Sequence, residues 1–273
     1  MMRWLILTSL GCGSGGGFVG QQAEDTQAPK LGEGLVAITG AEVVLGETDD
    51  EAWSEFFGRE GEYRTIIPAH AFVVDDFYID RFPFPGVDGA NWFTDGAHHS
   101  TIEALDAKLA DFGRRACTIP ELLYAAAGPD NLRYPYGDAH VSGRCDGDDT
   151  NPEPIGTFTL CESDFGVRDF MVRATWGRID DQTREAIDGT GDHEQISEDL
   201  EYGVYGGTSR SDTIQAHSNF GFHTHAKEGE DRYLDDGFRI CADSTPSTNQ
   251  DAAFERWRTN AVEAGSFAAM YGQ

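Results

Sequence analysis

The chain of 273 residues carries 20 lysines and arginines against 48 aspartates and glutamates, which gives a formal net charge of −28. A surface with this charge repels nucleic-acid phosphates, so we exclude nucleic acid as a partner. The 33 glycines and 11% aromatic residues are typical of a loop-rich α+β domain rather than a helical bundle. The acidity fits either solubility in a salty medium or the binding of divalent cations.

The first twelve residues have the layout of a short export signal. Arg3 precedes an apolar run that ends at Leu10, and a Gly11-Cys12 junction follows. The run is too short to span a bilayer as a helix. The junction resembles the lipidation box of bacterial lipoproteins, in which the cysteine carries a lipid. Residues 1–12 are therefore predicted to be a lipoprotein signal with Cys12 lipidated, and plain export or a cytosolic hydrophobic start are the alternatives.

A polar, glycine-rich segment follows this signal. It opens with Gly-Ser-Gly-Gly-Gly at Gly13 to Gly17 and shows no apolar period as far as Gly34. Such a composition behaves as a flexible coil. We expect residues 13–34 to tether one domain, residues 35–243, to a bacterial membrane through the lipid anchor, in the periplasm or at the cell surface.

The chain has five cysteines, which is an odd number for an exported protein. If Cys12 takes a lipid, the remaining four can form two disulfides in an oxidising compartment. Their spacing leaves three connectivities open, and no two of them form a Cys-x-x-Cys pair, which argues against a zinc or thioredoxin-type site. These four cysteines are Cys117, Cys145, Cys161 and Cys241.

The sequence of the first half of the domain predicts two strand regions and two helices. Leu35–Leu45 favours a strand, a turn and a second strand, and the β-rich run Ala71–Ile79 favours one strand. Apolar residues at helical spacing predict a helix over Ile102–Phe112. Thr118 and Glu121 form a capping box that predicts the start of a second helix.

The second half of the domain contains fewer regular patterns. We expect loops and short strands over Arg133–Gly166 and an acidic, exposed segment over Asp180–Leu200. The tail 244–273 is expected to contain a helix near Asp251–Ala264. Short apolar runs predict further strands at Tyr202–Tyr205, Asn219–His225 and Gly237–Cys241.

Five segments, in order, resemble landmarks of the formylglycine-generating (sulfatase-modifying) family. They are Phe77–Arg81, Arg115–Leu122, Tyr134–Asp138, Cys161–Asp169 and Gly237–Ile240. The resemblance implies an α+β, loop-rich, C-type-lectin-like fold with little regular secondary structure. It also implies disulfides that join Cys117 to Cys241 and Cys145 to Cys161.

Enzymes of this family oxidise a substrate cysteine to formylglycine with two active-site cysteines and copper. In the place of the segment that precedes those cysteines the chain has Tyr205–Ser209, and Arg210–Asp236 contains no cysteine. A Cu(I) site of this type needs soft thiolate ligands. We therefore expect no such copper site and no formylglycine-generating activity.

The family also binds calcium through oxygen ligands. Here the matching segment, Val172–Gly177, has Arg173 where the family has asparagine and lacks the family's glutamate. Calcium requires six to eight oxygens, so this site is expected to be lost. Asp146, Asp148 and Asp149 lie near a second family calcium position, where they form either a calcium site or an acidic, solvated loop.

Three histidines offer the alternative chemistry. They are His217, His223 and His225, and they lie in the region that carries the family's catalytic pair. His223 and His225 are two residues apart, so on a strand both side chains point to the same face. Such imidazoles bind zinc, copper or iron, or they form a surface histidine pair. We expect a non-catalytic surface binding or structural module with a protein or carbohydrate ligand. The alternatives are a metal-dependent enzyme with a rebuilt histidine site and a diverged sulfatase-modifying enzyme.

Overall fold

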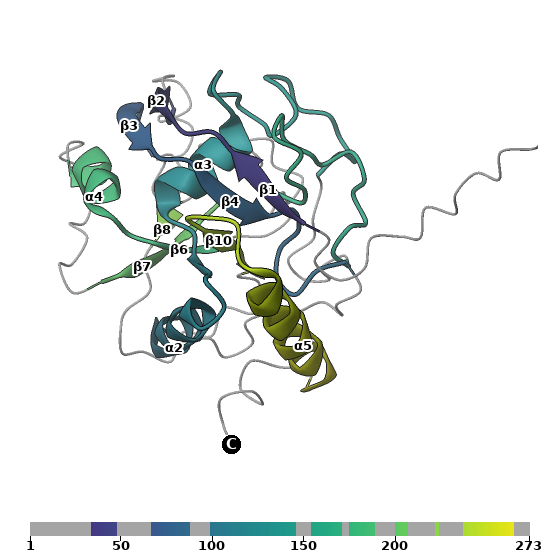
Figure 1. The fold of residues 1–273 in the computed structure, drawn as a ribbon. Helices are drawn as coiled ribbons and strands as arrows, with labels where there is room; N and C mark the ends of the chain where they lie inside the picture. Colours follow the sequence, from purple (N-terminus) through teal and green to yellow (C-terminus); the bar gives the residue numbers. More distant parts are fainter. Residues whose placement is uncertain are drawn as a thin grey trace, which may run out of the picture.

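Helices and strands mix along the whole described chain, as the composition predicts. The computed structural model describes residues 34–47, 67–87, 99–145, 154–170, 175–188, 200–206, 222–223 and 237–264. Within these ranges, four helices surround and separate three small sheets (Figure 1). The α+β class is therefore confirmed.

The first sheet joins segments that are far apart in the sequence. Its strands are antiparallel and follow the order β1 (Leu35–Ile38), β4 (Phe77–Asp80), β10 (Ile240–Ala242) and β5 (Arg115–Ala116). Strand β4 lies between β1 and β10, and its Ile79 is fully buried. The sheet therefore connects the beginning and the end of the domain.

The second sheet contains β2 (Ala41–Leu45) and β3 (His70–Val74) as an antiparallel pair. The single strand predicted over Ala71–Ile79 is wrong, because this run is divided between β3 and β4. At the division, the Asp76 carboxylate accepts a hydrogen bond from the Gly40 amide at 2.8 Å. A Cβ atom on Gly40 would lie 2.1 Å from the Val74 carbonyl oxygen, so only glycine permits this crossing of the two chain segments.

The third sheet follows the order β8 (Phe222–His223), β7 (Tyr202–Tyr205), β6 (Thr175–Arg178) and β9 (Gly237–Phe238). Strand β9 is parallel to β6 and the other pairs are antiparallel. The run predicted as one strand at the end of the domain is divided at Arg239, so that β9 and β10 enter different sheets.

Helix α3 (Ile119–Ala127) lies at the centre of the fold, and all nine of its residues are buried (Figure 1). The predicted capping box is confirmed at its start, where Thr118 and Glu121 bond each other's backbone amides. Strand β6 packs closely against α3, since a Cβ on Gly177 would lie 2.8 Å from a methyl carbon of Leu122. Close packing of this kind buries most of the helix surface.

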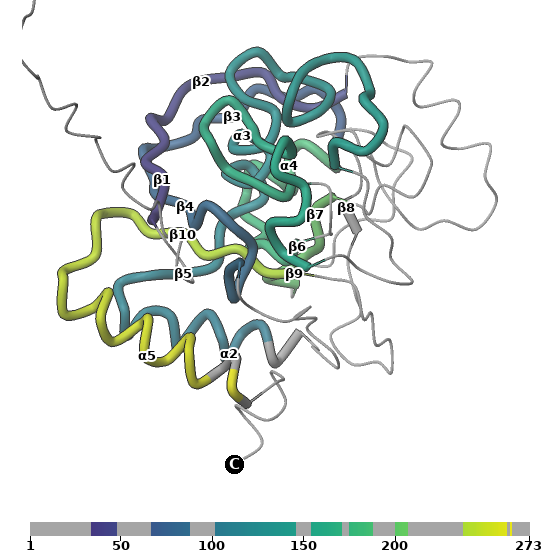
Figure 2. The backbone as a smooth tube through the Cα atoms, turned by 90° about the vertical axis from the view of Figure 1, so that its right-hand side faces the viewer, coloured from purple at the N-terminus to yellow at the C-terminus, as the bar shows by residue number. Residues whose placement is uncertain are grey.

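Helices α2 (His99–Ala110) and α5 (Thr248–Ala264) lie side by side at one end of the molecule (Figures 1 and 2). Both helices were expected, and both are present. After α2, the Phe112 ring contacts Phe254 and Trp257 of α5, with ring centroids 5.7 and 5.5 Å apart. Phe254 is fully buried, so α5 contributes to the same core as the preceding domain.

Helix α4 (Asp181–Asp188) lies beside β3 in the segment predicted to be acidic and exposed. That prediction is wrong for Ala186, Ile187 and Leu200, which are buried in the core around α3. The acidic composition of the segment did not predict this burial, because only a few apolar residues lie within a polar stretch. None of the described helices is both long and apolar enough to cross a bilayer.

Candidate ligand-binding cleft

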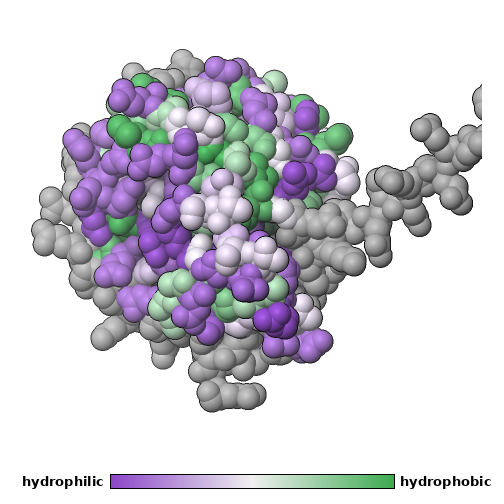
Figure 3. Space-filling view, in the orientation of Figure 1, coloured by the Kyte–Doolittle hydropathy of each residue, from purple (hydrophilic) through white to green (hydrophobic). Residues whose placement is uncertain are grey.

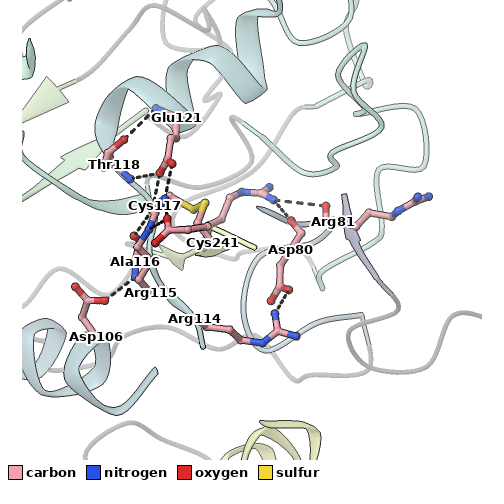
Figure 4. The surroundings of a disulfide bond; sticks show 12 residues. Asp80, Arg81, Asp106, Arg114, Arg115, Ala116, Cys117, Thr118, Glu121 and Cys241 are labelled. Atoms are coloured by element: carbon pink, nitrogen blue, oxygen red, sulfur yellow. Dashed lines mark hydrogen bonds and ion pairs between the residues drawn. A yellow bond between two sulfur atoms is a disulfide. The ribbon is translucent and has the colours of Figure 1, made fainter. Parts of the chain in front are cut away.

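The Cys117–Cys241 disulfide forms the centre of the best-defined polar region of the molecule (Figure 4). Cys117 directly precedes the capping residue of α3, and Cys241 lies in β10, 124 residues later. Both side chains are fully buried. The bond therefore fixes the start of the central helix to the last strand of the first sheet, in the pairing that the family resemblance implies.

A second disulfide joins Cys145 to Cys161 across 16 residues, and this pairing also matches the one implied. Together the two bonds use four of the five cysteines in the chain. Cys12 is the one cysteine of the sequence outside these two bonds.

Arg115 lies beside the first disulfide and is held by two carboxylates. Its guanidinium donates to both Glu121 oxygens at 2.7 and 2.6 Å and to Asp243 at 2.7 Å. Burial by itself would lower the pKa of Arg115, but the hydrogen bonds to Glu121 and Asp243 outweigh it and raise the pKa above its usual value. Glu121 also caps α3 through the Thr118 amide, so the position of Arg115 is fixed to the helix start.

Next to Arg115 the surface forms an open, polar cleft of about 330 Å³. One wall is the end of β3, a second is the start of α3, and a third is the start of α4. Hydrophilic side chains predominate on the α4 side of this face (Figure 3). Five carboxylates line the cleft against the single guanidinium, and they belong to Asp75, Asp76, Glu121, Asp180 and Asp243.

Several of these carboxylates are held in place by the backbone. Asp180 accepts from the amide and the hydroxyl of Thr183 at 2.8 and 2.6 Å, which caps the start of α4. Asp76 accepts from Gly40, as described above. Because Glu121 and Asp243 already neutralise Arg115, the cleft as a whole carries excess negative charge. It fits ligands with ammonium or guanidinium groups, or hydroxyl groups that donate to carboxylates.

Behind the disulfide lies a buried network of charges that holds α5 to the sheet. Asp80 of β4 faces Arg114 at 3.3 Å and Arg258 at 3.6 Å, and Arg114 also bonds Asp251 at 2.9 Å. Burial raises the pKa of Asp80 above its usual value, against the lowering effect of Arg258 and Arg114. The Phe254 ring packs against both guanidiniums, with centroid distances of 4.1 and 4.9 Å. This network has a structural role, because Asp80, Arg114 and Arg258 are buried and none of its members lines the cleft.

A second buried network surrounds Asp106 of α2. Its carboxylate accepts from the Ala116 amide at 2.6 Å, from Arg178 at 2.5 Å and from the Tyr202 hydroxyl at 2.7 Å. Burial and the bond to Asp106 both raise the pKa of Tyr202, so its hydroxyl stays protonated at neutral pH. The network joins α2 to three strands, β5, β6 and β7.

The metal and lipid residues predicted from the sequence lie outside the described residues. The structure describes only the backbone of His223, which pairs with Val204 in the third sheet. Within the described part of the chain, no three histidine, cysteine or acidic side chains converge in a way that would hold a metal ion. The predicted site residues of which the structure describes nothing are Cys12, Asp146, Asp148, Asp149, His217 and His225.

The cleft itself was missed by the sequence analysis. Arg115 and Glu121 belong to a segment that resembles the family, but no sequence pattern predicted that they bond each other. Asp76, Gln182 and Asp243 come from three further segments, and only the fold brings them to one place. The sequence offered one hint. Arg115 lies two residues before Cys117, and Asp243 lies two residues after Cys241, the cysteine to which Cys117 is bonded.

No protein-family model matches this chain, and no curated protein sequence matches it. The likeness to the formylglycine-generating family is therefore carried by the five sequence segments alone. The cleft, in contrast, is defined by contacts within the chain and does not depend on that likeness.

Proposed function

We propose that this chain is a non-catalytic binding module that uses the acidic cleft beside Cys117–Cys241. In this proposal it has the C-type-lectin-like fold of the formylglycine-generating family and is exported to the periplasm or cell surface on a lipid at Cys12. The observation that carries the proposal is the way the cleft is built. The Arg115 ion pairs line the cleft next to the buried disulfide, so a ligand meets groups that are already ordered, which lowers the entropic cost of binding.

The use of the cysteines supports a role other than that of the family's oxidases. Two disulfides leave one thiol in the chain. We expect a peptide with a sulfatase motif to keep its cysteine after incubation with the protein, as measured by mass. Conversion of that cysteine to formylglycine would contradict the non-catalytic proposal directly.

Binding is tested with the full-length chain, using lysine-rich peptides, acidic peptides and neutral oligosaccharides as probes. The variant Asp75→Asn with Asp76→Asn removes two charges from the cleft, and its amide at position 76 can still accept from Gly40. The matched control Asp111→Asn with Asp164→Asn removes two exposed charges elsewhere. A probe that binds the wild type and the control several-fold more tightly than the cleft variant supports the proposal. If no probe distinguishes the two variants, the cleft is not the binding site.

The rival interpretation, a metal-dependent enzyme at His217, His223 and His225, predicts a bound transition metal. We expect the purified protein to contain none at stoichiometric amounts. A stoichiometric metal that is lost in the variant His223→Ala with His225→Ala would overturn the non-catalytic proposal in favour of the rival.

A further inference from the structure

A side chain occupies the place of a neighbouring strand on β3. The Val73 amide donates to Gln182 Oε1 at 2.7 Å, and Gln182 Nε2 donates to the Val73 carbonyl oxygen at 3.0 Å. An antiparallel strand makes the same pair of bonds to one residue of its neighbour. The amide of Gln182, in the first turn of α4, therefore imitates the peptide group of an added strand.

The edge that Gln182 covers has the properties of a strand-addition site. Among the described residues, β2 is the strand that pairs with β3, and it lies on the other edge. Phe72 and Val74 point into the core, whereas the Val73 side chain is 56% exposed. Backbone groups alternate along a strand, so Ala71 directs its amide and carbonyl to the same side as Val73. Exposed strand edges are places where other chains pair.

The charges next to this edge determine the kind of partner. Strand β3 runs directly into Asp75 and Asp76, and Asp180 and Asp243 line the same cleft. The guanidinium of Arg115 is already bonded to two carboxylates. A second copy of this chain, with its net charge of −28, is disfavoured by repulsion, whereas a basic segment is attracted.

We propose that the β3 edge at Val73 binds an extended, lysine- or arginine-bearing peptide segment of a partner protein by strand addition. The peptide backbone replaces the Gln182 amide on Val73, and its basic side chains reach the carboxylates of the cleft. The proposal rests on the proposed function of the cleft and adds the class of ligand and its mode of binding.

The test uses a short peptide of alternating lysine and valine and the full-length protein in about 0.15 M salt, which screens charges beyond roughly 8 Å. Three further probes are the same peptide with N-methyl groups on alternate amides, a glutamate–valine analogue and a neutral oligosaccharide. We expect the lysine–valine peptide to bind, N-methylation to weaken it at least about tenfold through lost backbone bonds, and the glutamate analogue not to bind.

The variant Gln182→Ala removes the amide that the peptide must displace. We expect it to bind the lysine–valine peptide about fivefold more tightly than the wild type, since the two exposed hydrogen bonds of the Gln182 amide to Val73 no longer compete. A role of Gln182 in stability alone would not produce a gain in affinity. Circular dichroism checks that the variant is folded, and Gln182→Asn, with a shorter side chain, provides a second variant with the same expected direction.

The outcomes separate this proposal from the previous one. Equal affinity for the plain and N-methylated peptides, weakened by Asp75→Asn with Asp76→Asn, would overturn strand addition and leave the acidic cleft as a binding site. Preferential binding of the oligosaccharide at the cleft would do the same. Absence of binding by every probe would overturn both proposals.

Discussion

Around Cys117–Cys241, a long-range cross-link coincides with strand pairing and buried ion pairs, whereas the described residues around Cys145–Cys161 form no helix and no strand beyond isolated bridges. Cys241 pairs with Ile79 on one side and with Arg115 on the other within the first sheet. Cys145 and Cys161 form a small separate cluster with Tyr136 and Phe158. We refer to these as the frame (strands β4, β5 and β10 with the start of α3) and the loop region (134–145 and 154–170).

The difference concerns what each disulfide contributes. In the frame, the native geometry is already fixed by backbone bonds and by the ion pairs of Asp80 and Arg115, so the disulfide acts mainly by restricting the unfolded chain. In the loop region, the contacts are turns and side-chain bonds rather than strand pairs, such as the bond from Arg144 to the Leu160 carbonyl oxygen at 2.9 Å and the ion pair of Arg168 with Glu162 at 2.6 Å. There we expect the disulfide also to maintain the folded conformation.

The largest effect is expected from Cys117→Ser with Cys241→Ser. This bond closes 124 residues, and loop-closure entropy predicts a loss of about 5 kcal/mol in the free energy of unfolding. Urea unfolding measures it. Because the frame keeps its other contacts, we expect the far-ultraviolet circular dichroism of the folded variant to remain that of the wild type. A loss under about 2 kcal/mol would show that the unfolded chain is restricted by other means.

The variant Asp80→Asn tests the other half of the frame. It leaves Arg114 and Arg258 buried without their shared carboxylate, and removal of one partner from such a group costs about 3 to 5 kcal/mol. We expect the free energy of unfolding, measured with urea, to fall by about 4 kcal/mol. Asp111→Asn is the control, since Asp111 forms an exposed pair with Lys108 whose loss costs under about 1 kcal/mol. Equal effects of the two substitutions would mean that the buried network does not stabilise α5.

The sequence predicted the features of the frame that depend on neighbouring residues. The start of α3 follows from Thr118, Glu121 and the apolar residues after them, all within one turn, and its capping box is confirmed. The helix near Asp251–Ala264 also follows from local spacing. The contact of its Phe254 with Phe112, just after α2, could not be predicted in this way, because segments more than a hundred residues apart share no local pattern.

The sequence did not predict where strands change partner. The division at Asp75 and Asp76 depends on the approach of Gly40, and the division at Arg239 depends on its fully buried guanidinium. That guanidinium donates to the backbone oxygens of Asp80 and Arg168. The cleft is a product of the same long-range pairings, which explains why its residues could not be identified from composition or spacing.

In the loop region, Cys145→Ser with Cys161→Ser is expected to cost about 3 kcal/mol, because the bond closes only 16 residues. Its distinguishing effect is local. We expect faster amide hydrogen exchange within residues 134–170 of the folded variant and unchanged exchange in β4 and β10. If exchange increases equally in both regions, the loop region is not maintained by its disulfide, and the contrast with the frame fails.

The smallest effect is expected from the tyrosines at alkaline pH. Burial, with a further contribution from Tyr136, raises the pKa of Tyr134 to about 12. The folded state therefore holds this proton more tightly than the unfolded state, whose tyrosine titrates near 10. The resulting stabilisation is fully present below about pH 10 and is lost as the pH rises from about 10 to 12.

The variant Tyr134→Phe removes this contribution, so we expect its free energy of unfolding to fall less steeply than that of the wild type between about pH 10 and 12. In the third sheet, burial and the bond to Asp106 raise the pKa of Tyr202 of β7 further than that of Tyr134. Phenolate absorbance of the folded protein should therefore show Tyr134 titrating before Tyr202, as a step near pH 12 that is missing in Tyr134→Phe. If a step of the same size persists near pH 12 in Tyr134→Phe, another phenol ionises there, and the loop region does not differ from the third sheet in how firmly it excludes solvent.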